Sequence, residues 1–330
     1  MELTFGIEFL ANEDAQTLAE LIKFSEDNGL EYAWITDHYN NRDAYGLLTY
    51  IAARTDKIKL GPGVTNPYTR TAAQLASAIA TVNEVSGGRA VFGIGPGDKV
   101  TFDSLGIEWE KPLTTVKETV EVVRAFIRGG KVSYDGDVCQ IKGAKLNFGV
   151  GDIPVYIGAQ GPKMLALAGA IGDGALVNAS HPRDFEYAVR AIKAGAESAN
   201  RDFSKFDVGA YTSFSVADTS EAAVKAARPV TAFIVAGSPD AVFEKHGISL
   251  DDVEKVRAGF KKGFSDAIAA VTDDMVDVFS ICGNPDECIS RIDDLIDAGV
   301  TQIVTGSPLG PKKKAAIELI GKEIIPHFKD

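Results

Sequence analysis

Short runs of hydrophobic residues alternate along this chain with longer segments in which apolar residues recur at helical spacing. In the first unit, a strand-like run from Leu3 to Phe9 precedes a segment that opens at Asp14 and stops at Gly29, with apolar residues every three or four positions. That spacing predicts an amphipathic helix, and the glycine predicts its end. This alternation is typical of parallel strands joined by crossover helices.

The same reading predicts eight strands in the whole chain, at 3–9, 32–35, 57–60, 90–94, 154–157, 175–178, 208–216 and 302–305. Beyond the first unit, helices are predicted at 45–54, 72–85, 113–127, 163–171, 183–199, 220–236, 285–298 and 312–328. Eight strands that alternate with helices predict an α/β fold of the (β/α)8 TIM-barrel type, because an open doubly wound sheet would fit the repeat less well.

Two stretches interrupt the repeat. Residues 131–148 contain the turn signal Asp135-Gly136-Asp137 and predict an inserted hairpin. Residues 237–275 predict extra helices before the last strand. Because neither stretch is flanked by a linker rich in serine, glycine or proline, we expect one TIM-barrel domain over 1–330.

Composition narrows the possible partners. The chain has 46 acidic and 34 basic residues and a formal net charge of −12, which argues against nucleic-acid and anionic membrane partners. No apolar run approaches the roughly 18 residues of a membrane span, and Met1 to Thr4 lack a signal peptide's basic segment. We therefore expect a soluble, cytoplasmic protein. Cys139, Cys282 and Cys288 have no C-x-x-C spacing, so neither a disulfide framework nor a metal site is predicted.

Candidate chemistry lies where the predicted strands end, because active sites of TIM barrels lie at the carboxyl ends of the strands. Glu8 closes the first strand, and it is interpreted either as a solvated or capping carboxylate or as a general acid with a raised pKa. Asp37 and His38 follow the second strand. An Asp-His pair can fix a histidine tautomer and present a donor to a heterocycle, although a structural histidine is the alternative.

The third and fourth strands lead into loops rich in glycine and proline. Gly63, Val64 and Asn66 stand after the third strand, in a backbone that is expected to be either a tight turn or a ligand contact. Gly95-Pro96-Gly97-Asp98 follows the fourth, and its G-x-G-x-G spacing differs from the dinucleotide fingerprint. Small residues there allow a flat ring to approach the backbone. Asp98 is a second candidate carboxylate, or a helix cap.

The fifth and sixth strands end in possible phosphate sites. Ala159-Gln160-Gly161 leads into a helix at Pro162, and free amides at a helix N-terminus bind phosphate. Asn178 and Ala179 repeat this arrangement after the sixth strand. The run 312–314, three lysines, fits a solvated helix face better than an anion site.

Together these loops resemble those of a known family, the bacterial-luciferase-like barrels, and within it the methylenetetrahydromethanopterin reductases of methanogenic archaea. The resemblance covers essentially the whole chain and is carried by 36–41 (TDHYNN), 61–66 (GPGVTN), 93–98 (GIGPGD), 158–162 (GAQGP) and 306–308 (GSP). It implies coenzyme F420, an 8-hydroxy-5-deazaflavin with a phosphate-bearing tail. It further implies a non-prolyl cis peptide at Gly63-Val64 behind the ring, and the tail phosphate at the helix that Gly161 opens.

The resemblance also implies a reaction, in which a hydride passes from reduced F420 to the methylene carbon of methylenetetrahydromethanopterin. Opening of the methylene bridge needs a proton on nitrogen, so Glu8 is predicted as the acid, and Asp98 is predicted to place it or to tune its pKa. A homo-oligomer is expected from the family. Two alternatives stay open at this point: an FMN-dependent monooxygenase of the same superfamily, and a non-catalytic barrel that binds a flavin-like ligand.

Overall fold

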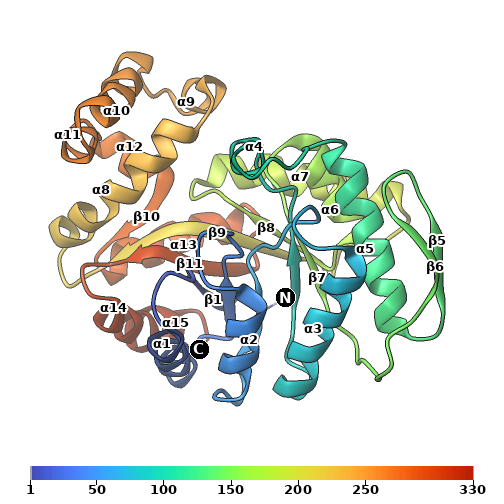
Figure 1. The fold of residues 1–330 in the computed structure, drawn as a ribbon. Coiled ribbons are helices and arrows are strands. Elements are labelled where there is room, and N and C mark those ends of the chain that lie inside the picture. The colour runs from blue at the N-terminus through green and yellow to red at the C-terminus, as the bar shows by residue number, and fades with distance from the viewer. Residues whose placement is uncertain (1, 330) are drawn as a thin grey trace. The chain divides into compact units, whose positions relative to one another are not determined.

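The computed structural model describes residues 2–329 and forms a (β/α)8 barrel (Figure 1). In hydrogen-bonding order the barrel strands run β3-β2-β1-β11-β9-β8-β7-β4. Parallel bridges from Leu60 to Ala90 and from Thr65 to Ile94 join the β3 side of this path to the β4 side. The strands are β1 (Thr4–Phe9), β2 (Tyr32–Ile35), β3 (Lys59–Pro62), β4 (Phe92–Ile94), β7 (Val155–Gly158), β8 (Gly174–Val177), β9 (Asp207–Val216) and β11 (Gln302–Leu309).

Helices connect these strands as the alternating pattern predicts. The helices between successive barrel strands include α1 (Ala15–Asp27), α2 (Ala44–Ala52), α3 (Ala72–Ser86), α4 (Lys99–Leu105), α5 (Pro112–Arg128), α6 (Pro162–Ile171), α7 (Pro182–Ser198), α8 (Ser220–Gly237) and α13 (Pro285–Asp297), and β11 is followed by α14 (Lys313–Leu319), the π-helical turn η1 (Ile320–Ile324) and α15 (Ile325–His327). Within residues 2–329, no helix is both long and apolar enough to cross a membrane.

Register determines which side chains of β1 face the barrel interior. Glu8 pairs with Trp34, and Gly6 pairs with Tyr32 two residues earlier. A Cβ on Gly6 would lie 3.4 Å from the Trp34 indole nitrogen, so this face of β1 points at the interior aromatic side chains. Because side chains alternate along a strand, Glu8 shares that inward face.

Contacts divide the chain into two units, which are described separately. The larger unit comprises Gly6–Val177 and Tyr187–Gly209. It carries the predicted insertion as an antiparallel hairpin of β5 (Val132–Asp135) and β6 (Gln140–Ala144) beside α5 (Figure 1). The buried Glu118 carboxylate on α5 holds this hairpin, since it accepts the backbone N–H groups of residues 137, 138 and 139 at 2.8–2.9 Å.

The smaller unit comprises Glu2–Phe5, Asn178–Glu186 and the described part of the segment that begins at Ala210. After α8 it continues into α9 (Asp240–His246), α10 (Leu250–Lys262), α11 (Phe264–Ala269) and α12 (Asp273–Phe279). Helices α9, α10 and α12 share an apolar core with α8 in which Phe243, Val253 and Met275 are fully buried. Extra helices are therefore present where the sequence predicts them. A single domain over 1–330 stays a prediction.

Four local features differ from the sequence-based prediction. β10 (Ser280–Gly283) is an additional short strand, which pairs in parallel with β9 outside the barrel path. β3 begins two residues later than predicted and continues to Pro62. The predicted last helix is interrupted by η1, and α4 was not predicted. Strands and helices this short carry no full hydrophobic period, so pairing and capping decide them.

Polar side chains secure the amino-terminal ends of the strands in the larger unit. Glu26, whose side chain is 4% exposed, accepts the backbone N–H groups of residues 56, 57 and 58 just before β3. Arg89, just before β4, donates to the backbone oxygens of residues 52, 55, 58 and 86 and to the hydroxyl of Thr55. Hydrogen bonds of this kind link the connection before one strand to the helix or connection that lies next to it.

Candidate functional site

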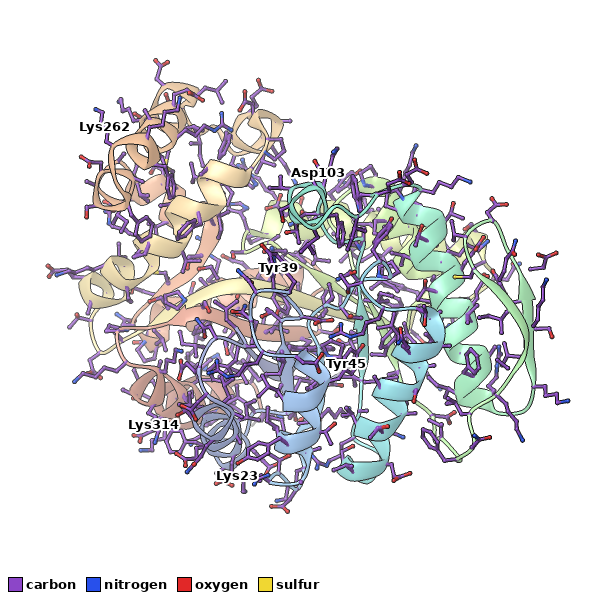
Figure 2. All side chains as sticks on the ribbon, in the orientation of Figure 1. Lys23, Tyr39, Tyr45, Asp103, Lys262 and Lys314 are labelled. Atoms are coloured by element: carbon purple, nitrogen blue, oxygen red, sulfur yellow. The ribbon has the colours of Figure 1, made fainter. Side chains whose placement is uncertain are left out.

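At the opposite, carboxyl ends of β2, β3 and β4, the loops surround a cavity of about 300 Å³. Six of its lining residues are among those the sequence predicts for the site: Asp37, His38, Val64, Asn66, Gly97 and Asp98. Seven more line it: Tyr39, Thr65, Thr69, Arg70, Thr101, Phe102 and Leu105. Figure 2 labels Tyr39 on the first of these loops and Asp103 on α4, the helix that carries three of the lining residues.

The loop after β3 contains the predicted cis peptide between Gly63 and Val64. The Val64 side chain lies against glycines at the ends of two other strands. A Cβ added to Gly95 would lie 2.8 Å from Val64 Cγ2, and one added to Gly158 would lie 3.1 Å from the same atom. Glycine therefore lets three strand ends approach closely, and it leaves backbone without side chains beside the cavity.

Asp37 and His38 do not form the pair that the sequence suggested. The Asp37 carboxylate, 7% exposed, accepts hydrogen bonds from Thr65 Oγ1 at 2.6 Å and from Arg70 Nη1 at 2.5 Å. His38 is exposed, and its Nδ1 is 2.9 Å from Asn40 Oδ1. Consecutive side chains on an extended segment point to opposite sides, so the two residues meet different neighbours. The predicted tautomer control of His38 by Asp37 is therefore wrong.

Asn66 presents a donor to the cavity. Its side-chain Oδ1 accepts the backbone N–H groups of Tyr68 and Thr69 at 3.0 Å and the Thr69 hydroxyl at 3.1 Å. Three donors on one oxygen fix which end of the amide is oxygen and which is nitrogen. The Nδ2 group has no hydrogen-bond partner among residues 2–329, so it can donate to a ligand acceptor.

Asp98 caps a helix, which is one of the two roles that the sequence allows for it. It is the N-cap of α4, and its Oδ1 accepts the backbone N–H of Thr101 at 2.8 Å. The residue is exposed, and its second carboxylate oxygen has no hydrogen bond with a described residue. The preceding Gly97 has φ of 64°, and a Cβ there would lie 2.5 Å from the Phe102 ring. Pro96 is held by its carbonyl, which accepts from Trp109 Nε1 at 2.8 Å.

Glu8 lies near the end of β1 and is 6% exposed. Its inward face and its pairing with Trp34 place the carboxylate inside the barrel, one residue before the strand ends. Burial of a carboxyl disfavours its charged form. Of the alternatives that the sequence left open, the solvated carboxylate is therefore excluded.

The loop after β7 ends in a helix N-terminus with no side-chain cap. Gly161 is the N-cap of α6, Pro162 is the first helical residue as predicted, and no side-chain cap hydrogen bond is formed there by the residues that the structure describes. Ala159 is buried and donates its N–H to the Leu176 carbonyl, whereas Gln160 is exposed. Asn178 and Ala179 directly follow β8 and belong to the smaller unit, where α7 begins at Pro182, one residue before the predicted start.

Sequence reasoning missed Arg70 and the residues of α4. A signal for α4 exists, because an aspartate at position 98 and a glycine at 106 bracket seven residues as N-cap and C-cap. Arg70 has no such signal. Its partners are 27 and 33 residues away in the sequence, and only the fold brings them together.

Comparisons with known proteins place this architecture in a family. A family model for luciferase-like monooxygenases matches residues 4–302. A 5,10-methylenetetrahydromethanopterin reductase from Methanolobus tindarius is 55% identical over 98% of this chain and 100% of its own length. The one from Archaeoglobus fulgidus is 55% identical over 99% and 100%. A solved structure of the coenzyme F420-dependent tetrahydromethanopterin reductase from Methanopyrus kandleri superposes with a TM-score of 0.97 at 48% identity, covering 99% of this chain and 100% of that one.

The chain belongs to the luciferase-like monooxygenase family. Within that family it lies close to proteins named 5,10-methylenetetrahydromethanopterin reductase, with about half of all positions identical along the full length. An F420-dependent secondary alcohol dehydrogenase has a TM-score of 0.83 at 21% identity. This likeness shows a shared fold only.

Proposed function

We propose that this protein is an oxidoreductase that reduces 5,10-methylenetetrahydromethanopterin to the 5-methyl form with reduced coenzyme F420. The observation that carries the proposal is the identity of 55% over full length to reductases of that name, on a chain whose loops at the strand ends surround a cavity. Fold alone would not distinguish this activity from others in the family. The identity over the full length of both chains supports it.

The residues at the strand ends fit a flat, anionic cofactor. Val64, Gly95 and Gly158 offer a surface of backbone and one branched side chain, against which a planar ring can lie. Asn66 Nδ2 and His38 supply donors beside it. The uncapped amides at the start of α6, after Ala159, Gln160 and Gly161, suit a tail phosphate, because a helix N-terminus favours negative charge.

Further members of the proposed site contribute less directly. Asp37 supports the loop that carries Val64, and Gly63, Pro96 and Gly97 give the backbone its shape. Asn178 and Ala179 are proposed to bind the tail as well, by analogy with the loop after β7. When bound, F420 supplies hydride at its ring carbon, and the protein's task is to hold donor and acceptor carbons together.

We propose Glu8 as the general acid. A carbon–nitrogen bond of the methylene bridge breaks as hydride adds to the carbon, and the released nitrogen takes a proton. A buried carboxyl, whose charged form is disfavoured, can hold that proton until it is needed. Asp98 is proposed to assist through its second oxygen, because the capping bond occupies only Oδ1. Neither a metal ion nor a covalent nucleophile enters this scheme.

We further propose a cytoplasmic homo-oligomer whose small-molecule partner is the pterin. The net charge of −12 supports the absence of nucleic-acid and membrane partners. Sedimentation of the purified protein would measure the oligomer.

The test is spectrophotometric. Oxidation of reduced F420 is followed without oxygen, with and without methylenetetrahydromethanopterin, and we expect oxidation only when the pterin is present. Reduced FMN replaces F420 in a parallel reaction. Oxidation that ignores the pterin, or equal rates with FMN, would contradict the proposal. In a separate reaction with oxygen present, protein-dependent oxygen consumption with reduced FMN would favour a monooxygenase.

A further inference from the structure

Arg70 bridges two carboxylates beside the cavity. Its guanidinium donates from Nη1 to Asp37 Oδ2 and from Nη2 to Asp43 Oδ2, both at 2.5 Å. The three residues come from the loop after β2, the start of α2 and the segment before α3. Burial would lower the pKa of Arg70, but Asp37 and Asp43 together raise it, so the residue keeps its charge.

The carboxylate that Arg70 holds is also the anchor of the loop after β3. Thr65 Oγ1 donates to the same Asp37 oxygen that Arg70 contacts. Thr65 is fully buried, and its backbone binds β4 on both sides: its N–H donates to the Gly93 carbonyl at 3.0 Å, and its carbonyl accepts from the Gly95 N–H at 2.9 Å. Arg70, Asp37 and Thr65 therefore form a continuous chain of polar contacts.

Thr65 stands between the two residues that this loop offers to a ligand. Val64, on one side, fills the space between Gly95 and Gly158. Asn66, on the other, lines the cavity and uses only its Oδ1 in hydrogen bonds with described residues. A shift of Thr65 would thus move the apolar surface and the donor together. Misplacement by about 1 Å can cost about 100-fold in function.

The Arg70 guanidinium also packs against an aromatic ring. Its central carbon lies 5.1 Å from the centre of the Tyr45 ring, which is buried at the start of α2. Asp43 is fixed as well, because it caps α2 by accepting the Gly46 N–H at 2.8 Å. A planar fork between two carboxylates and a ring has little freedom, which suits a residue that sets the position of others.

We propose that Arg70 is a positioning residue for the cofactor: through Asp37 and Thr65 it fixes Val64 and Asn66 in the arrangement that binds the F420 ring. This inference rests on the proposed function. Arg70 itself need not touch the cofactor. Its effect is on cofactor affinity, with less effect on the rate once the cofactor is bound.

Equilibrium binding of oxidised F420 tests this, with thermal unfolding measured on the same samples. We expect Arg70→Met to weaken binding about 10- to 100-fold, the range for loss of charged hydrogen bonds. Arg70→Lys should recover part of the affinity, because a single ammonium cannot bridge both carboxylates as a fork does. At saturating F420, kcat should fall much less than the affinity.

Arg54→Met is the matched control. Arg54 also stacks on a tyrosine, with its central carbon 3.4 Å from the Tyr50 ring centre, and it donates to a backbone carbonyl, but it does not line the cavity. Its replacement should leave F420 affinity unchanged. Because Arg70→Met leaves Asp37 without its cation, the double variant Asp37→Asn with Arg70→Met provides a second test without that buried charge.

The outcomes separate the two proposals. Wild-type protein that fails to bind F420 would contradict the proposed function. Wild-type protein that binds, together with folded Arg70→Met and double variants whose affinity lies within about twofold of it, would overturn the role of Arg70 alone. A loss of thermal stability with unchanged affinity would likewise make Arg70 a structural residue only.

Discussion

The amino-terminal and carboxyl ends of strands β2 to β4 differ in how completely their polar side chains are paired. At the amino-terminal ends, Arg89 donates to five oxygens and Glu26 accepts from three backbone N–H groups. At the carboxyl ends, Asn66 fixes its oxygen with three donors but keeps its Nδ2 free for the cavity. Complete pairing stabilises a fold, whereas an oriented, unused donor prepares a binding site.

The glycines differ in the same sense. Gly61 and Gly93 lie within the barrel wall, where a Cβ would meet a backbone oxygen at 2.1 Å, so they allow strands to pack. Gly95 and Gly158 lie nearer the carboxyl ends of the strands, and a Cβ at either position would meet the Val64 side chain instead. Gly95 and Gly158 thus shape a surface at the carboxyl ends of the strands. Gly61 and Gly93, which lie inside the barrel wall, cannot do so. Four predictions test this division, from the largest expected effect to the smallest.

Glu8→Gln should lower kcat by about 100- to 10,000-fold, the usual contribution of a general acid. The amide keeps the shape and burial of the side chain, so F420 affinity should stay within about twofold. Steady-state rates and cofactor binding measure the two quantities. The matched control is Glu118→Gln, another buried glutamate, which should reduce stability but leave kcat unaltered. Near-normal turnover of Glu8→Gln would remove it from the mechanism.

Arg89→Met should lower the free energy of unfolding by about 3 kcal/mol, since several half-buried carbonyls lose their donor. Urea unfolding measures this, with exposed Arg128→Met as a control that should change little. The folded fraction should bind F420 normally. Reduced affinity at temperatures where the variant is folded would mean that the amino-terminal ends also shape the site.

The stability that Glu26 contributes at the amino-terminal ends of the strands depends on pH. Burial acts to raise the pKa of this carboxyl, but three backbone N–H groups and the Lys23 ammonium outweigh burial and lower it to about 2. An unfolded glutamate has a pKa of about 4.3. The stabilisation is therefore fully present above that value and is lost as the pH falls toward 2. Between pH 6 and pH 3, wild-type protein should lose about 2 kcal/mol that Glu26→Gln does not lose.

Urea titrations of the two proteins at both pH values provide the measurement. The sign of the change in the free energy of unfolding is informative, because a carboxylate with a raised pKa would stabilise the protein on acidification instead. Equal losses in wild type and Glu26→Gln would show that other carboxylates cause the acid sensitivity.

Much of the fold could be predicted because hydrophobic period directly reflects burial. Each of the eight barrel strands overlaps a predicted run, although β3 is displaced by two residues, and Pro162 begins its helix as expected. β10 was not predicted, because its four residues, SICG, include only one aliphatic side chain and the strand exists through pairing with β9. The last helix reads as continuous, since a π-helical turn keeps the apolar face that the pattern detects.

The candidate site divides in the same way. Glu8, Val64 and Asn66 could be named because each follows a predicted strand, and the fold class determines what a strand end means. The partners of Asp37 could not be named. Adjacent in sequence to His38, it instead bonds with Thr65 and Arg70, and side chains from distant loops meet only after the barrel has formed.

Gly95→Ala tests the surface that the glycines leave. The new Cβ would lie 2.8 Å from Val64 Cγ2, so the valine must rotate or the strand end must move. We expect F420 affinity to fall about tenfold, which equals about 1.4 kcal/mol, with a smaller change in thermal stability. Gly149→Ala is the control, because a Cβ at Gly149 meets nothing within 4 Å. If Gly95→Ala lowers stability and leaves affinity intact, Gly95 belongs with Gly61 and Gly93 as a packing residue, and the bare surface of the proposed site reduces to Gly158 and the cis peptide.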